Sequence, residues 1–333
     1  MSYTFQYCVC IGRFQPFHNG HHELVREALS QAETVLIVIG STDKAPNIQN
    51  PWTADQREAM ILSALTDQEK ERVKFVQVRD FWYTQNRWLT EVQRRVYDAT
   101  DGIDDDKICD VGEVSYFPQW KFFKMRNIDR MPHATTIRDL YFTMDNAYKN
   151  HVSPGVVNYL EEFKKTVSFK NLKEEYEHIR NYRAAWTGAP FPPTFVTVDS
   201  VVIRSGHVLT VRRKGNPGRG LIALPGGFLN QNETILDGAL RELKEETGIK
   251  VSKEELEKAV IESKVFDYPD RSLRGRTITH AYLIDLGSGN LPLVKGSDDA
   301  DKAWWMSLSD FYTIEDRFFE DHWQIISYFC SRF

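Results

Sequence analysis

Two kinds of apolar pattern follow one another along the first half of the chain. Short apolar runs of strand length predict buried strands, and segments in which apolar residues recur every three or four positions predict amphipathic helices. Strands that alternate with helices indicate an α/β fold with a parallel sheet covered by helices. The predicted strands cover residues 5–11, 34–39, 73–78 and 107–111, and the predicted helices cover residues 20–32 and begin again at Thr53.

The pattern changes near the middle of the chain. Residues 154–186 are rich in Glu, Lys and Arg and predict helix, whereas residues 187–193 contain three prolines, which fit neither a helix nor a strand. Residues 194–204 and 207–213 then alternate as the strands of a hairpin do. We therefore predict a first domain over residues 1–186, a Pro-rich linker over 187–193 and a second domain over 194–333.

Composition fits this division. A chain of 333 residues is long enough for two domains of roughly 150 residues, and 41% hydrophobic with 27% charged residues is ordinary for a globular protein. The net charge of -5 argues against a nucleic-acid partner. No apolar run is long enough for a membrane, no signal peptide is visible, and four cysteines form no CxxC pair. We expect a cytoplasmic protein, with a homo-oligomer left open.

The first candidate site lies where the first predicted strand meets the first predicted helix, in Gly-Arg-Phe-Gln-Pro-Phe-His-Asn-Gly-His. His18 and His21 share one face of the first helical turn, and Gly20 leaves room for a phosphate to approach the backbone. The helix N-terminus and Arg13 favour an anion. No nucleophile with an adjacent base is present, so the pattern favours direct nucleotidyl transfer. The alternative is a pair of incidental surface histidines.

This segment resembles the nucleotidylyltransferase superfamily and, more closely, the archaeal-type nicotinamide mononucleotide (NMN) adenylyltransferases. The similarity extends to residues 50–53 with Arg57, and to residues 134–138, although His133 stands where that family usually has serine. The resemblance covers about the first half of the chain and implies a Rossmann-like nucleotidylyltransferase sheet. It implies catalytic roles for His18, His21 and Arg138, and ATP binding by Gly12, Arg13, Phe14, Gly20 and Thr135.

The NMN partner is expected to need an aromatic face and an amide. Trp82, Asn86 and Trp88 lie in the predicted loop after the third strand, at the carboxyl side of the sheet. Asn86 and Trp88 also belong to the resemblance. We predict that these three residues bind NMN, and ordinary packing of the tryptophans is the alternative.

The second candidate site is a helix with carboxylates on one side. Glu242, Glu245 and Glu246 are spaced to project together, and such like charges destabilise a bare helix. A divalent cation such as Mg²⁺ or Mn²⁺ would remove the repulsion. Gly248 is placed to end the helix. A solvated acidic face is the alternative to a metal site.

Residues 227–249 match every position of the Nudix box. This resemblance implies a Nudix α/β/α sandwich with a mixed sheet, and metal-dependent hydrolysis of a nucleoside diphosphate linked to another group. It implies metal binding by Glu242, Glu245 and Glu246, and structural roles for Gly227, Glu233 and Arg241. Residues 216–228 look like the ADP-ribose pyrophosphatase group. We expect ADP-ribose contacts from Arg271, Arg274 and Arg276, whose segment is otherwise a surface loop.

Together the two motifs resemble fused bacterial proteins that join such an adenylyltransferase to a Nudix domain. This resemblance implies a bifunctional enzyme with small-molecule substrates: ATP and NMN for synthesis of NAD⁺, and ADP-ribose for hydrolysis to AMP and ribose 5-phosphate. Two alternatives stay open. The first domain could serve another phosphate acceptor, and the Nudix half could be a ligand sensor that regulates it.

Overall fold

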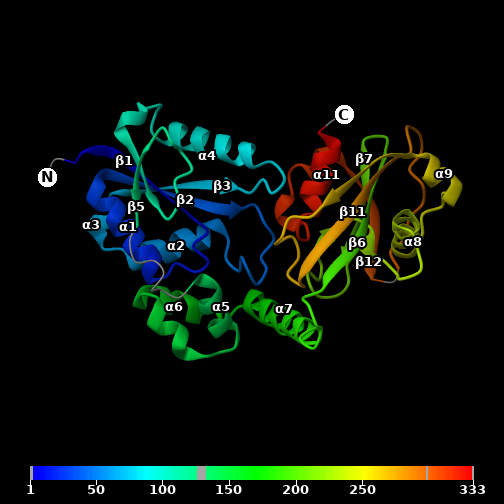
Figure 1. Ribbon diagram of the computed structural model, residues 1–333, viewed down its shortest axis with the longest axis horizontal. Helices are drawn as coiled ribbons and strands as arrows, with labels where there is room; N and C mark the ends of the chain where they lie inside the picture. Colours follow the sequence, from blue (N-terminus) through cyan, green and yellow to red (C-terminus); the bar gives the residue numbers. More distant parts are fainter. Residues whose placement is uncertain (1–2, 126–132, 298, 332–333) are drawn as a thin grey trace. The chain divides into compact units, whose positions relative to one another are not determined.

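The computed structural model describes residues 3–125, 133–297 and 299–331. Its packing divides the chain into two units, residues 1–173 and residues 174–333, and each is described by itself (Figure 1). Within the described residues, no helix is long and apolar enough to span a membrane. All four cysteines are buried and carry free thiols.

The first unit contains a parallel sheet with the strand order β3-β2-β1-β4-β5. The four predicted strands are confirmed, and a short fifth strand was not predicted. Because the chain runs outward from β1 to β3 and then returns to β4, the direction of strand order reverses between β1 and β4. The strands are β1 (Phe5–Gly12), β2 (Ala32–Thr42), β3 (Val73–Arg79), β4 (Ile108–Gly112) and β5 (Lys121–Lys124).

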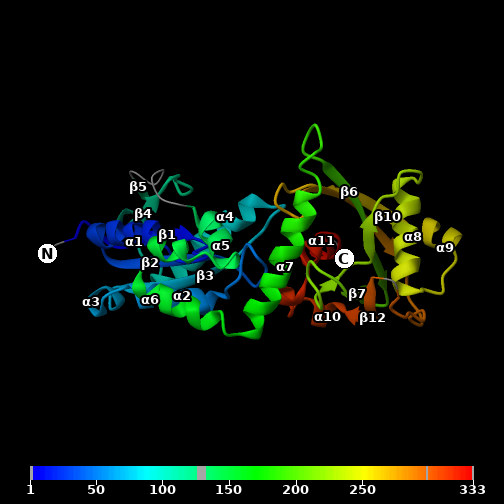
Figure 2. The same ribbon diagram turned by 90° about the horizontal axis from the view of Figure 1, so that it is seen from below.

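Helices cover both faces of this sheet. Figure 1 shows α4 on one side of the strands and α1 and α2 on the other, and Figure 2 shows the same unit from below. Val9 of β1 packs in a cluster with Val92 and Val96 of α4, whereas the thiol of the next residue, Cys10, contacts the carbonyl of Leu24 in α1. Neighbouring residues of a strand point to opposite faces, so α4 and α1 cover opposite faces. The helices are α1 (Asn19–Gln31), α2 (Ala54–Ala64), α3 (Asp67–Lys70), α4 (Gln85–Ala99), α5 (Ala134–Phe142) and α6 (Pro154–Phe163), with 3₁₀ turns η1 (Asp105–Lys107) and η3 (Asn146–His151).

The predicted helical stretch of residues 154–186 forms two helices, α6 and α7 (Val167–Ala184). The division between the units falls inside α7, between Lys173 and Glu174. Phe169 packs against Tyr141 in the first unit. The Arg183 guanidinium donates to the Leu273 carbonyl, 2.8 Å away, in the second unit. The linker predicted at 187–193 begins only after this helix and stays a prediction.

The second unit contains a mixed sheet with the order β10-β11-β6-β7-β12, in which β11 and β6 are parallel and the other pairs along that order antiparallel. The predicted hairpin is confirmed, because Ser205 and Gly206 form its turn with φ of 46° and 72°. The strands are β6 (Thr194–Arg204), β7 (His207–Arg213), β8 (Ile222–Ala223), β9 (Gly226–Phe228), β10 (Val260–Phe266), β11 (Arg276–Asp285) and β12 (Ala300–Ser307).

Helices lie on both sides of this sheet (Figure 1). Leu240 and Leu243 of α8 pack against Val202 of β6, and Phe329 of α11 packs against Phe266 of β10. Gly248 ends α8 with a φ of 54°, as predicted. The α/β/α architecture is therefore confirmed. The helices are α8 (Ile235–Thr247), α9 (Lys253–Lys258), α10 (Leu308–Phe311) and α11 (His322–Cys330), with the 3₁₀ turn η4 (Glu315–Arg317).

Candidate active sites

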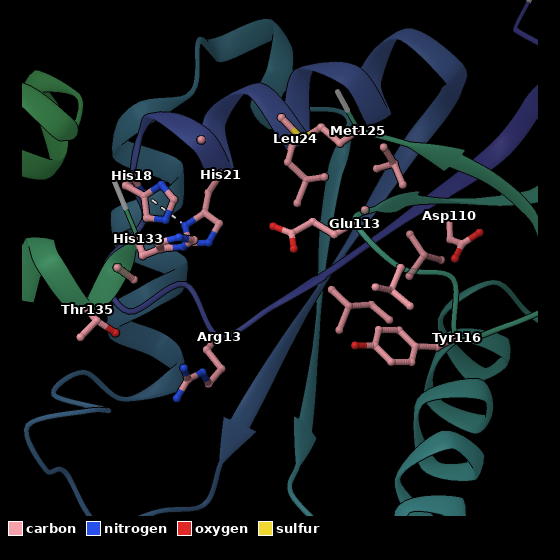
Figure 3. A pocket seen from close by; sticks show the side chains of 17 residues that line it. Arg13, His18, His21, Leu24, Asp110, Glu113, Tyr116, Met125, His133 and Thr135 are labelled. Atoms are coloured by element: carbon pink, nitrogen blue, oxygen red, sulfur yellow. Dashed lines mark hydrogen bonds between the residues drawn. The ribbon is translucent and has the colours of Figure 1, made fainter. Parts of the chain in front are cut away.

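A cavity of about 480 Å³ opens in the first unit at the carboxyl ends of β1 and β4 (Figure 3). Ligands of open α/β sheets bind at this kind of reversal in strand order. The start of α1, the loop after β4 and the start of α5 complete its walls. Five residues predicted from the sequence line it: Arg13, His18, Gly20, His21 and Thr135.

His18 and His21 form a stacked pair at the N-terminus of α1. Their ring centroids lie 3.6 Å apart with 26° between the planes, and the His18 backbone N–H donates to His21 Nδ1 at 3.4 Å. Burial, with neighbouring His133, lowers the pKa of His18 to about 4, and burial lowers the pKa of His21 well below its usual value. Both imidazoles are therefore neutral near pH 7, and a phosphate beside them would favour their charged forms.

Two buried arginines hold the turn between β1 and α1. Arg57 donates to the carbonyls of Arg13, at 2.8 Å, and Gly40, at 2.6 Å. Arg138 donates to the Gln15 carbonyl at 2.6 Å and to Thr135 Oγ1 at 3.2 Å. Burial lowers the pKa of each guanidinium to about 10, so both stay charged at neutral pH. They bring positive charge beneath the turn, although Arg138, predicted to be catalytic, lies behind the cavity wall.

Gly12 and Phe14, predicted to bind ATP, shape the turn from inside. Phe14 has a φ of 53° and a buried ring that contacts His21 edge-on, with centroids 4.9 Å apart. A Cβ at Gly12 would lie 2.9 Å from that ring. A larger residue at Gly12 would therefore displace the Phe14 ring from its place beside His21.

The three residues predicted to bind NMN are not among the described residues that line the cavity. Trp82 donates from Nε1 to Asp80 at 3.3 Å and carries the Lys44 ammonium 3.9 Å from its ring centroid. Trp88 packs edge-on against Tyr116, which is a cavity residue. Asn86 is exposed in the first turn of α4. The edge-on contact with Tyr116 thus connects Trp88 to the cavity wall.

Sequence reasoning missed three polar residues of the cavity. Asp110 belongs to β4, and Glu113 and Tyr116 follow it in the loop. Asp110 is 5% exposed, and burial raises the pKa of its carboxyl group to about 7. An acidic residue inside the apolar run Ile-Cys-Asp-Val was the signal that could have identified it. The cavity also contains His133 at the start of α5, the histidine that stands in the serine position of the motif.

Arg241 is the centre of the candidate metal helix in the second unit. Its guanidinium binds both carboxylate oxygens of Glu233, at 2.9 and 2.7 Å, and also reaches Glu242 and Glu245. This pairing holds the pKa of Glu233 down at about 2. Arg241 also donates to the Phe228 carbonyl at 3.3 Å. It therefore ties the loop before α8 to the helix, which is the geometry expected of a structural role.

Glu242 and Glu246 converge on the glycine pair of β9. Glu246 is 7% exposed and accepts a hydrogen bond from the Gly226 N–H at 3.0 Å. A Cβ at Gly227 would lie 2.5 Å from a Glu242 carboxylate oxygen, so a larger residue there would displace that carboxylate. Burial raises the pKa of Glu246 to about 8, with Glu242 adding to the effect. A divalent cation would stabilise the charged carboxylates, so these oxygen donors fit the predicted metal.

Glu245 differs from the other two carboxylates of the helix. Its side chain is 46% exposed and lies 2.8 Å from Arg241. Among the described residues, no group of three or more His, Cys, Asp or Glu side chains has the arrangement of a metal site. The structure therefore brings Glu242 and Glu246 together and leaves Glu245 with Arg241.

The three arginines predicted to contact ADP-ribose are held by different partners. Arg271 is 2% exposed and forms a bidentate ion pair with Asp321, at 3.0 and 2.8 Å. Arg274 lies over the Phe228 ring, 5.0 Å from its centroid. Arg276 donates to the Asp267 carbonyl at 2.5 Å. Arg271 thus serves a buried ion pair, and Arg274 is the one that lies beside the Nudix loop.

Family models match both units. Residues 9–97 match a family described as cytidylyltransferase-like, and residues 193–329 match the NUDIX domain. The fold and the two sites therefore define an enzyme that joins a nucleotidyltransferase-like domain to a Nudix domain.

Comparison with individual proteins identifies the family. The chain is 38% identical to a bifunctional NMN adenylyltransferase/ADP ribose pyrophosphatase from Francisella tularensis, solved with AMP and a manganese ion, with a TM-score of 0.93 over 98% of this chain and 99% of that one. It belongs to the family of bifunctional NMN adenylyltransferase/ADP-ribose pyrophosphatases, which confirms the fusion inferred from its two motifs.

Separate relatives match each half of the chain. A nicotinamide/nicotinic acid mononucleotide adenylyltransferase of Acinetobacter baylyi is 30% identical over 52% of this chain and 95% of its own length. An ADP-ribose pyrophosphatase of Methanocaldococcus jannaschii is 36% identical over 34% of this chain and 63% of its own length.

Proposed function

We propose that this chain is a bifunctional enzyme of NAD metabolism. Its first unit transfers the adenylyl group of ATP to NMN, giving NAD⁺ and pyrophosphate. Its second unit hydrolyses ADP-ribose to AMP and ribose 5-phosphate. The observation that carries the proposal is the match along 98% of the chain to a protein with both activities in its description.

Adenylyl transfer would need no covalent intermediate. The NMN phosphate oxygen attacks the α-phosphorus of ATP, and pyrophosphate leaves with its bonding electrons. His18, His21, Arg13 and the free N–H groups at the start of α1 would donate to the oxygens on which charge develops. The neutral imidazoles can take up protons as the phosphates approach. Arg57 would keep the turn in position through its bonds to the Arg13 and Gly40 carbonyls.

Hydrolysis in the Nudix unit would depend on a divalent metal. Glu242, Glu245 and Glu246 would hold it, and Mg²⁺ or Mn²⁺ suits their oxygen donors. When bound, the metal would neutralise the diphosphate and lower the pKa of a water molecule. Arg241 and Glu233 would keep the loop at Phe228 against the helix.

Two assays on the whole protein test both activities. Chromatography of reactions with ATP, NMN and Mg²⁺ should show NAD⁺ and pyrophosphate, and reactions with ADP-ribose should show AMP. Transfer to another phosphate acceptor at a higher kcat/KM than to NMN would contradict the first assignment. Tight binding of ADP-ribose without hydrolysis would contradict the second assignment and favour a Nudix unit that acts as a regulatory sensor.

The setting of the enzyme is also part of the proposal. Substrates such as ATP, NMN and ADP-ribose, together with four free buried thiols, support a cytoplasmic enzyme. We propose that its partners are these small molecules, without nucleic acid or membrane.

A further inference from the structure

The cavity of the first unit has two chemically different ends. Figure 3 shows His18, His21 and His133 grouped at one end, whereas Asp110 and Tyr116 lie at the other. The histidine end suits phosphates. The proposed reaction leaves Asp110, at the opposite end, without a role.

Asp110 is a buried carboxyl group with an unused acceptor. It is 5% exposed, and its Oδ1 atom has no hydrogen-bond partner among the residues that the structure describes. It pairs in register with Val9, which belongs to an apolar cluster with Leu36 and Val38. A buried polar group without a partner destabilises the folded chain, and a charged one does so more strongly. Such a group is expected where a ligand supplies the missing donor.

Aromatic side chains stand next to this carboxyl group. Tyr116 lines the same end of the cavity, and its exposed ring is held edge-on by Trp88, with centroids 5.6 Å apart. An aromatic face offers a flat apolar surface to a heterocycle. A flat surface beside one buried acceptor suits a planar nitrogen heterocycle that carries an amino group.

We propose that Asp110 determines substrate specificity, because its carboxyl group accepts a hydrogen bond from the NH₂ group of a nucleotide's heterocycle. This inference rests on the proposed adenylyl transfer. Both substrates offer such a group, as the amino group of adenine or the carboxamide of nicotinamide. A heterocycle that presents only an acceptor there, such as hypoxanthine or nicotinic acid, meets an unpaired oxygen and is rejected.

Asp110→Asn tests this with little change in shape, because an amide can also donate to an acceptor. Values of kcat/KM are measured for NMN against nicotinic acid mononucleotide, and for ATP against inosine triphosphate. We expect one of the two preferences to fall by about tenfold. A fall in the first places nicotinamide at Asp110, and a fall in the second places adenine there.

Asp106→Asn is the matched control, because Asp106 is exposed just before β4 and does not line the cavity. Its two preferences should stay within twofold of the unchanged protein. Asp110→Leu removes the acceptor altogether. It should lower kcat/KM for the NH₂-bearing substrate whose preference falls in Asp110→Asn.

Binding measurements keep the test decisive if a variant loses turnover. Circular dichroism then checks folding, and calorimetric dissociation constants for the same four nucleotides replace kcat/KM. If the protein without the substitution makes NAD⁺ and a folded Asp110→Asn protein keeps both substrate preferences, only the role of Asp110 is overturned. An unchanged protein that makes no NAD⁺ would instead overturn the proposed function.

Discussion

Burial decides the charge of the most informative side chains. It lowers the pKa of His18 and His21, and it raises the pKa of Asp110 and Glu246. Each of these groups is driven toward its neutral form by the protein alone. A ligand of opposite charge, or a hydrogen-bond donor in the case of a carboxylate, would return it toward its charged form. Perturbed groups in a cleft are therefore good candidates for function, with the histidine pair as the clearest case.

The histidine pair gives the first prediction. His18→Ala or His21→Ala should lower the rate of NAD⁺ synthesis by about 10²–10³-fold, because each removes a donor to the reacting phosphates. Hydrolysis of ADP-ribose should be unchanged. His22→Ala is a matched control, since His22 follows in the same turn but does not line the cavity. Near-normal NAD⁺ synthesis by both His18→Ala and His21→Ala would contradict the proposed contact of these histidines with the phosphates.

Asp110 gives a prediction about stability. A carboxyl group whose pKa is raised from 3.8 to about 7 binds its proton more tightly in the folded chain, so folding is penalised as the pH rises through this range. Asp110→Asn should therefore raise the free energy of unfolding, by on the order of 1–4 kcal/mol at pH 8 and by less at pH 5. Urea denaturation at both pH values measures the difference. A gain that is equal at pH 5 and pH 8, or that matches Asp106→Asn, would contradict burial of the charged carboxylate as the cause.

Glu245 and Glu246 predict different outcomes within one motif. Glu246→Gln replaces a buried carboxyl group beside Glu242, so it should abolish hydrolysis and the rise of Tm that Mg²⁺ gives the unchanged protein. Glu245→Gln should also lower hydrolysis, and it should weaken the contact with Arg241. The exposed Glu254 of α9 provides the control substitution. Full hydrolysis by Glu246→Gln with an unchanged Mg²⁺ response would move the metal away from this helix.

At the scale of elements, the sequence predicted those whose pattern extends over several residues. Four strands of the first sheet, the hairpin of the second unit and the end of α8 at Gly248 are confirmed. The fifth strand of the first sheet, Lys-Phe-Phe-Lys, is too short and too charged at its ends to show alternation. The pattern of apolar and polar residues also could not predict side-chain contacts between residues that are far apart in the sequence. A surface loop and a buried ion pair look alike at Arg271 until Asp321, fifty residues later, is placed beside it.

The same limit applies to the candidate sites. The histidine motif and the Nudix box predict neighbours along the chain, whereas Asp110 and Tyr116 reach the first cavity from another strand. Arg138 shows why a motif does not settle a side chain's direction. A guanidinium fits a phosphate and a backbone carbonyl equally well, and in this protein it donates to Gln15.

Helix α7 gives a prediction for truncated proteins. A fragment of residues 174–333 should be more stable than one of residues 190–333, by about 2 kcal/mol or more. The longer fragment keeps Ile179, which is 1% exposed, and the bond from the Gly218 N–H to Glu175 at 2.9 Å. Chemical denaturation of both fragments measures the difference. Equal stabilities would mean that α7 contributes nothing to the second unit.

At the scale of the whole molecule, the residues described for each site belong to one unit. The cavity residues lie between Val9 and Thr135, and the residues described for the Nudix site lie between Gly226 and Arg276. A substitution in one site should therefore leave the other reaction intact, so that the second activity serves as an internal control for each variant.

Helix α7 also decides what a cut in the chain would do. A protease that cleaves the exposed segment around Phe191, whose side chain is 81% exposed, leaves residues 174–186 attached to the N-terminal piece. Those residues still pack in the second unit, where Trp186 meets Phe195 and Arg183 reaches Leu273. Cleaved protein should thus run as two bands in a denaturing gel and as one peak in gel filtration. The two pieces should therefore stay associated without a covalent connection, because the end of α7 on one polypeptide packs against the other.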